Sequence, residues 1–360
     1  MVNKHFETLH KIPEVAFQEV KTAAFLEQEL KKAGYQPVRV GKTGLYADLL
    51  VDQSLPWLVF RSDIDALPVT EETGLPYTSE HPGIMHACGH DAHMAMLLAA
   101  AQQLAGQKLP QNIRFVFQPA EEITAGAKEM IKAGAVPGNT VAAFGFHVWP
   151  GVPVGKVVAK AGPLMASSTR LTITVTGKNA HCSKRHLGAD ALLTIAKVAT
   201  RLQEAEAEAG NDGTVLFFGK MNSGTAHNIV ADHAEMVGSL RSYDPDTRQK
   251  VLDKLEEIVA EAGKQYGTQA VLNAFAYNPA VNNPAQLAEK TKVLLSDLIV
   301  DMESTLASED FSRYQEAAPG MFMWLGVGDT AALHNGKFQV PQKILPVGVD
   351  AWLRIANHKW

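Results

Sequence analysis

The sequence predicts an α/β fold in which an α/β sheet domain is interrupted by a smaller inserted domain of ferredoxin-like (βαββαβ) order. Up to Gly162, short apolar segments suited to strands alternate with helical segments, which is typical of α/β sheets. After Gly162 the order becomes strand, helix, strand, strand, helix, strand, and after Pro279 the α/β pattern returns. Because 360 residues are long for one hydrophobic core, we expect one domain over 1–167 and 277–360 and an inserted domain over 168–276.

Composition and charge exclude several classes of function. The net charge is −5 and no run rich in Lys or Arg occurs, so we expect no nucleic-acid partner. No apolar run approaches the length of a membrane span, and the first residues lack a signal-peptide core, so we expect no membrane association. The only two cysteines, Cys88 and Cys182, do not suit a disulfide framework and favour a reducing, cytoplasmic location.

The first domain combines helical and apolar segments in a regular order. Residues from His5 to Gly34 are predicted to be helical, with an interruption near Pro13 and an end at Gly34. The other predicted helices are Met94–Leu104, Ala285–Leu298 and Val347–His358. The predicted strands are Tyr46–Val51, Trp57–Phe60, Ile113–Phe117, Ala142–Phe146 and Met321–Gly326.

The inserted domain has a different pattern. Arg170–Val175 alternates like a strand with one exposed face, and Gly177–Gly188 is expected to be a loop. The remaining predicted strands are Val215–Phe218, His233–Arg241 and Gln269–Phe275, and the predicted helices are Asp190–Glu208 and Asp246–Gly267.

A short stretch from Met85 to Met94 concentrates one Cys, three His and one Asp just before a predicted helix. Thiolate and imidazole are ligands that first-row divalent metals prefer. Gly89 permits the turn that would let these groups converge. One such His alone is more often a capping or core residue, but the whole cluster favours a metal site.

Acidic or imidazole side chains follow three predicted strands at the point where each ends. Asp63 and Asp65 follow the first strand, Glu121 and Glu122 the second, and His147 the third. Because the carboxyl ends of parallel strands meet at one sheet edge, we expect these groups to form one site. Asp-x-Asp alone would suit a solvated loop or a helix cap equally well, but the threefold repetition favours a site.

The candidate metal ligands number five, which exceeds the three protein ligands of a typical mononuclear catalytic zinc. They suit two divalent ions about 3.5–4 Å apart with one shared ligand, and Cys88 could bridge as a thiolate. Glu121 would remain free to take a proton from water while its neighbour binds metal. These ligands are Cys88, His90, Glu122, His147 and His334.

The inserted domain offers further candidates. His181 and Asn228 lie in predicted loops and Arg241 ends a predicted strand. These groups could bind a substrate carboxylate and polarise a carbonyl, or they could have only a surface role. Ser308–Phe311 could shape a pocket wall or cap a helix.

Over nearly its whole length the chain resembles the aminoacylase/carboxypeptidase family of dinuclear metallohydrolases, and specifically its amidohydrolase branch. That branch includes N-acyl-amino-acid deacylases, hippurate hydrolases, auxin-conjugate hydrolases and N-acetyldiaminopimelate deacetylases. The similar motifs are His10-x-x-Pro13-Glu14, Arg61-Ser-Asp-Ile-Asp-Ala-Leu-Pro68, His86-Ala-Cys-Gly-His-Asp-Ala-His93, Phe117-Gln-Pro-Ala-Glu-Glu122, Gly145-Phe-His147, Ser308-Glu-Asp-Phe311 and Leu333-His334.

The resemblance implies a catalytic α/β domain and a lid domain that often mediates dimerisation, so we expect a homodimer through the lid. It implies the metal ligands named above, Glu121 as general base, and an active-site Asp that supports the metal centre, either Asp63 or Asp65. His181 would stabilise the oxyanion, in its own subunit's site or the partner subunit's. The lid loop usually reads Gly-Gly-His-Ala-x-x-Pro-His, whereas here it is Asn179-Ala-His-Cys-Ser-Lys-Arg-His186.

The implied reaction is hydrolysis of an amide between a small acyl group and an amino acid, with two divalent ions (Zn, Mn, Co or Ni). We expect His186, Asn228 and Arg241 to bind substrate. The first expected substrate is N-acetyl-L,L-diaminopimelate, in lysine biosynthesis. A broad N-acyl-amino-acid or hippurate amidohydrolase, a metal-dependent dipeptidase and a non-catalytic binding protein are the alternatives, and retention of both Glu121 and Glu122 speaks against the last.

Overall fold

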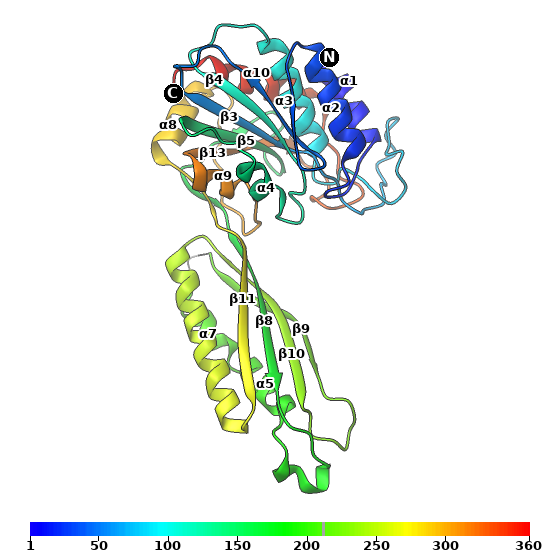
Figure 1. Cartoon of the computed structure of the whole chain (residues 1–360), viewed down its shortest axis with the longest axis vertical. Helices are drawn as coiled ribbons and strands as arrows, with labels where there is room; N and C mark the ends of the chain where they lie inside the picture. Colours follow the sequence, from blue (N-terminus) through cyan, green and yellow to red (C-terminus); the bar gives the residue numbers. More distant parts are fainter. Residues whose placement is uncertain (211–212) are drawn as a thin grey trace. The chain divides into compact units, whose positions relative to one another are not determined.

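The computed structural model describes residues 1–210 and 213–360. They form two compact units, here called the α/β unit (Met1–Leu164, Val281–Ser304 and Glu309–Trp360) and the inserted unit (Met165–Ala280 and Thr305–Ser308). The first unit contains a mixed sheet with helices and the second a separate antiparallel sheet (Figure 1). The predicted fold class is therefore confirmed.

The α/β unit is built on a seven-stranded sheet of order β1-β2-β4-β3-β5-β13-β6. Neighbouring strands are parallel from β4 through β3 and β5 to β13, and the outer strands β2 and β6 run antiparallel to their neighbours. The strands are β1 (Val38–Val40), β2 (Gly44–Leu49), β3 (Trp57–Asp63), β4 (Asn112–Gln118), β5 (Thr140–Pro150), β6 (Val157–Val158) and β13 (Gly320–Gly328).

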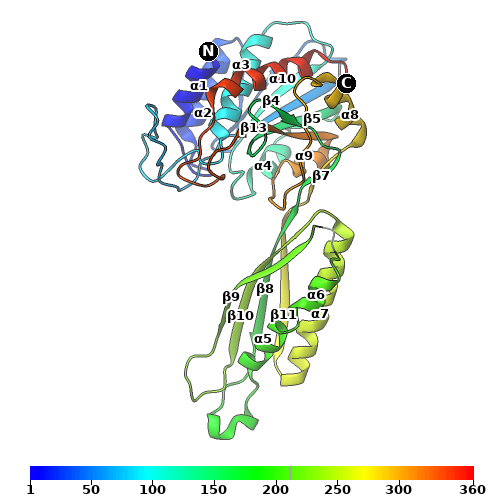
Figure 2. The ribbon, with the colours of Figure 1, turned by 180° about the vertical axis from the view of Figure 1, so that it is seen from behind.

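Helices cover both faces of this sheet, with α1, α3 and α10 on one face and α4 and α9 on the other (Figures 1 and 2). The central strands are consequently buried on both sides and consist mainly of apolar residues, as expected for parallel strands. The helices are α1 (Val2–Lys11), α2 (Val20–Lys32), α3 (His90–Leu104), α4 (Gly126–Lys132), α8 (Ala285–Leu294), α9 (Ser312–Ala317) and α10 (Leu345–Asn357).

Helix α3 starts at the Cys/His cluster and is almost entirely buried. Gly89 precedes it with a φ of 83°, a conformation that glycine adopts without strain. A Cβ at this position would lie 2.3 Å from Cγ2 of Val148, so the turn also needs the missing side chain. Ala-rich turns then let the helix pack closely between the sheet and helices α1 and α10.

The inserted unit has the predicted strand and helix order. Its four strands form an antiparallel sheet of order β11-β8-β10-β9, and α5, α6 and α7 pack on it around one apolar core. The elements are β8 (Ser167–Thr176), α5 (Ala191–Ala199), α6 (Leu202–Ala207), β9 (Val215–Ser223), β10 (His233–Ser242), α7 (Pro245–Tyr266) and β11 (Gln269–Asn278).

The interruption predicted near Pro13 is confirmed, because residues 12–19 are not helical and separate α1 from α2. Two predictions for the inserted unit were wrong. The single helix predicted over 190–208 breaks at Thr200 and Arg201, where Arg201 pairs with Glu204 and Glu261 instead. The loop predicted over 177–188 contains a 3-10 helix, Cys182–Leu187.

No helix in the described ranges, 1–210 and 213–360, is both long enough and apolar enough to cross a membrane.

Candidate active site

The candidate ligands of the α/β unit converge, as the strand order predicted. Asp63 ends β3, and the Glu121–Glu122 pair follows β4. His147 lies within β5, three residues before its end, because this strand is longer than predicted. His334 has a φ of 66°, and its backbone N–H donates to the carbonyl of Ala87 at 2.8 Å, which places it beside the Cys/His cluster.

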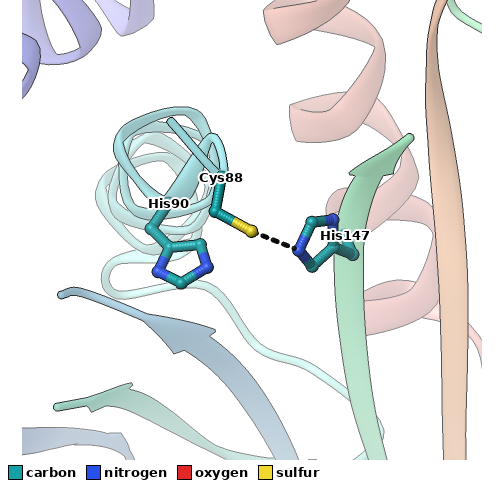
Figure 3. A group of neighbouring side chains, drawn as sticks. All are labelled: Cys88, His90 and His147. Carbon is teal, nitrogen blue, oxygen red and sulfur yellow. Dashed lines mark hydrogen bonds between the residues drawn. The ribbon is translucent and has the colours of Figure 1, made fainter. Parts of the chain in front are cut away.

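The ligand atoms form two groups of three that share Cys88. The first group is Cys88, His90 and His147, and the second is Cys88, Glu122 and His334; within each, the ligand atoms lie within 4.8 Å of one another. Figure 3 shows the first group, with Sγ of Cys88 directed at Nε2 of His147 at a distance of 3.3 Å. Two groups of ligands that share one side chain would suit a pair of neighbouring cations, with Cys88 as a bridging thiolate once metal is bound.

Two buried polar atoms at the centre of this cluster have no hydrogen-bond partner in the described part of the chain. They are Nε2 of His90 and Oε1 of Glu122, which lie 3.9 Å apart. Leaving such atoms unsatisfied is costly, whereas a metal ion would use the lone pairs of both. The residues present therefore fit a metal centre.

Hydrogen bonds orient two of the imidazole rings toward the cluster. Nδ1 of His90 donates to the backbone carbonyl of Asp65 at 2.9 Å, and Nδ1 of His147 donates to that of Val148 at 2.6 Å. In the neutral form of each ring, the form that binds a metal ion, this places the proton on Nδ1 and leaves Nε2 as the acceptor. Such a bond to the second ring nitrogen is the usual support of a metal-binding His.

Burial and crowded carboxylates dominate the electrostatics of the cluster. Burial, together with the nearby Glu309 and Glu122, raises the pKa of Glu121 well above its usual range. Burial and the carboxylates of Glu122 and Glu121 likewise raise the pKa of the Cys88 thiol. For His90, burial lowers the pKa, but Asp63 and Asp65 outweigh it and raise the value to about 10. A divalent cation would offset this concentration of negative charge.

Asp63 and Asp65 have different partners. The carboxylate of Asp65 accepts the backbone N–H of Glu121 at 3.1 Å and that of Glu122 at 3.0 Å, so it holds both glutamates at the cluster. Asp63 instead accepts from Arg61 at 2.8 Å and from His93 at 2.6 Å. The sequence spacing did not distinguish these two roles.

Two further groups of possible ligands are already occupied by protein contacts. In the group Asp63, His90 and His93, both ring nitrogens of His93 are used, since Nε2 accepts the N–H of Val148 at 2.8 Å. In the group Glu121, Glu309 and Asp310, the guanidinium of Arg61 neutralises the last two carboxylates.

Arg61 is a residue that the sequence reasoning missed as a part of the site. Its side chain is fully buried and lies 2.8 Å from Asp63, 3.0 Å from Glu309 and 2.6 Å from Asp310. The proposed pocket wall at 308–311 is therefore wrong for Glu309 and Asp310, which are 1% and 0% exposed and lie in this ionic cluster. The sequence did contain a signal for this role, because an Arg inside an apolar strand, two residues before Asp63, indicates a buried cation that needs acidic partners.

The inserted unit places its candidate residues at two ends of its sheet. His181 and His186 are exposed, and the backbone N–H of Cys182 donates to the carbonyl of Asn228 at 2.9 Å, so His181 and Asn228 are neighbours. They lie beyond one end of the β8–β10 pair, the end at which Thr176 of β8 pairs with His233 of β10.

Arg241 lies at the other end of the same strand pair, opposite Ser168. Ser168 and Thr176 are eight positions apart along β8, which corresponds to roughly 26 Å of strand. Burial lowers the pKa of Arg241. Within one chain, Arg241 therefore cannot contact the same small molecule as the loop that contains His181 and Asn228.

Comparisons with known proteins agree with this architecture and these motifs. The family profile described as Peptidase family M20/M25/M40 matches residues 59–358. The chain is 34% identical to an N-acetylcysteine deacetylase of Bacillus subtilis (strain 168), over 99% of this chain and 98% of that protein. It is 35% identical to an N-acetyldiaminopimelate deacetylase of Geobacillus thermodenitrificans (strain NG80-2), over 91% of this chain and 90% of that protein.

Solved structures show the same fold. A Bacillus subtilis protein described as a dinuclear metal binding peptidase from M20 family superposes with a TM-score of 0.88 at 32% identity, covering 99% of this chain and 96% of that one. A putative aminohydrolase from methicillin-resistant Staphylococcus aureus superposes with a TM-score of 0.94 at 27% identity, covering 98% and 95%. The chain therefore belongs to peptidase family M20/M25/M40, in its amidohydrolase branch, and is a hydrolase.

Proposed function

We propose that the chain is a metal-dependent amidohydrolase that removes a small acyl group from the amine of an N-acyl amino acid. The observation that supports this most strongly is the pair of ligand groups that share Cys88. Cys88, His90, Glu122, His147 and His334 would hold two divalent ions. The relatives named as deacetylases of N-acetylated amino acids support the substrate class.

The ions would supply Lewis-acid activation of water and of the scissile carbonyl. Glu121 is the general base: it takes the proton of the attacking water and returns it to the leaving amine. Its carboxylate lies within 4.8 Å of ligand atoms of His90 and Glu122, which places it beside the proposed metal centre. Glu122 binds metal and leaves Glu121 free.

Asp65, rather than Asp63, is the acidic residue that supports the metal centre and its base. Its carboxylate holds the backbone of Glu121 and Glu122, and its backbone carbonyl accepts Nδ1–H of the ligand His90. Asp63 would act on the metal centre indirectly, through its hydrogen bonds with Arg61 and His93.

Among substrates, N-acetyl-L,L-diaminopimelate is the first candidate, which would place the enzyme in lysine biosynthesis. The relative from Geobacillus thermodenitrificans supports it. N-acetylcysteine is the second candidate, because the Bacillus subtilis relative that acts on it aligns over nearly the full length of both chains.

We also propose that the inserted unit is a lid that forms a homodimer. His181 would stabilise the oxyanion, and Asn228, His186 and Arg241 would bind the substrate. Arg241 and the His181 loop lie at opposite ends of the β8–β10 pair. This separation supports an arrangement in which Arg241 binds substrate in one site and the His181 loop contributes to the site of the other subunit.

A substrate panel tests the proposal. The full-length protein, reconstituted separately with Zn²⁺, Mn²⁺, Co²⁺ and Ni²⁺, is assayed on N-acetyl-L,L-diaminopimelate, N-acetyl-L-cysteine, hippurate and free dipeptides. We expect deacetylation, abolished by a chelator, with kcat/KM highest for one of the two acetylated amino acids. Preferred cleavage of dipeptides would contradict the substrate class.

The variant E121Q is the control for the base. It should keep its metal content and lose at least about 100-fold in kcat. Full activity in E121Q would overturn the assignment of Glu121.

A further inference from the structure

Glu19 is a buried carboxylate that contacts the segment of the proposed base. It lies in the connection between α1 and α2 and is 0% exposed. Its Oε1 accepts the backbone N–H of Ala120 at 3.0 Å, across 101 residues of sequence. Ala120 directly precedes the Glu121–Glu122 pair.

The backbone at Ala120 is strained. Its φ is 54°, and Thr124 in the same segment has a φ of 58°, a region that non-glycine residues seldom occupy. Such conformations persist where surrounding contacts hold them, and they cluster at functional sites. The carbonyl of Ala120 accepts the N–H groups of Ala125 and Gly126, both at 3.2 Å. Ala120 is therefore the residue around which the segment turns, with both of its backbone groups bonded.

Buried carboxylates hold this segment at its beginning and at its end. Asp65 accepts the next two backbone N–H groups after Ala120. Asp310 accepts the N–H of Ala127 at 3.2 Å, where α4 begins. Close packing adds to these bonds, since a Cβ at Gly126 would lie 1.6 Å from the carbonyl oxygen of Pro119.

We propose that Glu19 is a positioning residue for catalysis: by holding the N–H of Ala120, it fixes the strained turn that aims the carboxylate of Glu121. This inference rests on the proposed role of Glu121 as general base. Glu19 does not touch the reacting atoms. Its effect is on the geometry of proton transfer, where a displacement of about 1 Å can cost on the order of 100-fold in rate.

Glu14 provides a matched control in the same connection. Its carboxylate accepts the N–H groups of Lys21 at 3.1 Å and Thr22 at 2.9 Å, so it stabilises the first turn of α2. It has no hydrogen bond to the 119–127 segment among the described residues. If the connection between α1 and α2 had only a structural role, E14A and a Glu19 variant would lower kcat by the same factor.

The experiment compares E19L, E19Q, E14A and the unaltered full-length protein, each reconstituted with Mn²⁺ and assayed on N-acetyl-L-cysteine and N-acetyl-L,L-diaminopimelate. Leu cannot accept the N–H of Ala120, whereas Gln can. We expect E19L to lower kcat by about 10- to 100-fold with KM and metal content within twofold. E19Q should restore kcat to within about threefold, and E14A should leave kcat unchanged.

Hydrogen exchange supplies a readout that does not depend on activity or metal. In the metal-free protein, the amides of 120–122 should exchange at least tenfold faster in E19L than in E19Q or E14A, because the bond to Ala120 is lost. If E19L does not fold, E19A takes its place in both measurements. Unchanged exchange at these amides, or an equal loss of kcat in E14A, would overturn the inference.

The double variant E19L/E121Q separates this inference from the proposed function. If Glu19 acts through Glu121, E19L should lower the residual rate of E121Q by less than about twofold. A fully active E121Q would overturn the proposed base, and the inference with it. An inactive E121Q together with a fully active E19L would overturn the positioning role alone.

Discussion

Nδ1 of His93 donates to Oδ1 of Asp63 at 2.6 Å, and this bond fixes the tautomer of a histidine outside the proposed set of metal ligands. Nε2 of His93 is thereby left to accept the N–H of Val148 at 2.8 Å. The carbonyl of Val148 in turn accepts Nδ1–H of His147 at 2.6 Å. The Asp63–His93 pair therefore orients the proposed ligand His147 through the backbone of Val148.

Replacing His93 should weaken metal binding. In H93L the N–H of Val148 loses its acceptor, so we expect the metal dissociation constant to rise about 10- to 100-fold, measured by titration calorimetry with Zn²⁺. The control is H5L, because His5 is also buried and, among the residues that the structure describes, its side chain hydrogen-bonds only to Gln102, at 2.9 Å. An unchanged affinity in H93L would show that the backbone of Val148 keeps its position without His93.

Replacing Cys88 should remove the shared ligand. With Co²⁺ bound, the wild-type protein should show a sulfur-to-cobalt charge-transfer band in the near ultraviolet, since a coordinating thiol is deprotonated. C88S should lose this band and at least one ion per chain. C182S serves as the control because Cys182 is exposed. Persistence of the band in C88S would contradict a thiolate ligand at this position.

Replacing Arg61 should destabilise the α/β unit. In R61L three buried carboxylates lose their cation, and breaking a buried ion pair on one side costs about 3–5 kcal/mol. The free energy of unfolding in urea, without metal, measures this loss. In the control R354Q, surface pairs with Asp297 and Asp350 are lost, each at a cost of about 0–1 kcal/mol. Equal losses in both variants would contradict the prediction.

His10 should make stability depend on pH. Burial lowers its pKa, but hydrogen bonds to Asp91 at 2.6 Å and to Glu71 at 3.2 Å outweigh burial and raise the pKa to about 10. The stabilisation is fully present below the unfolded pKa of about 6.5 and is lost as the pH rises through 10. Hydrogen bonding also lowers the pKa of Glu71, despite its burial, to about 2, so Glu71 stays charged from pH 6 upward.

The variant H10Q should therefore lose more stability at pH 6 than at pH 9.5, by at least about 1 kcal/mol. Urea unfolding of the metal-free protein at both pH values measures the difference, with H233Q, at an exposed position, as the control. The same loss at both pH values would show that the ring is uncharged in the folded protein.

The sequence allowed the strand ends and the Cys88 cluster to be predicted because both follow from local chemistry. A strand that is buried on both faces is apolar throughout, so the polar residues at its end stand out, as Asp63 and Glu121 do. Parallel strands then bring such ends together. The strand order of the inserted unit was predictable for the same reason, since alternation and helical periodicity are local signals.

The supporting contacts could not be predicted in this way. Arg61 and Asp310 are 249 residues apart, and Glu19 and Ala120 are 101 residues apart; no local period relates such pairs. A charged residue in a sequence is usually solvated, so the burial of Glu19 was not a natural expectation. The positive φ of Ala120 could not be predicted from the sequence either, because it results from contacts with other segments and not from the residue type.

Strand β13 lies between β5 and β6 in the sheet, although the whole inserted unit separates it from them along the chain. A ribosome-bound chain that has not yet released residues 320–328 must therefore leave β5 without this neighbour, and His334 is still absent from the ligand cluster. The sheet and the proposed metal centre are therefore complete only once the residues up to His334 have been synthesised, and until then the edge of β5 lacks its partner strand and is open to aggregation.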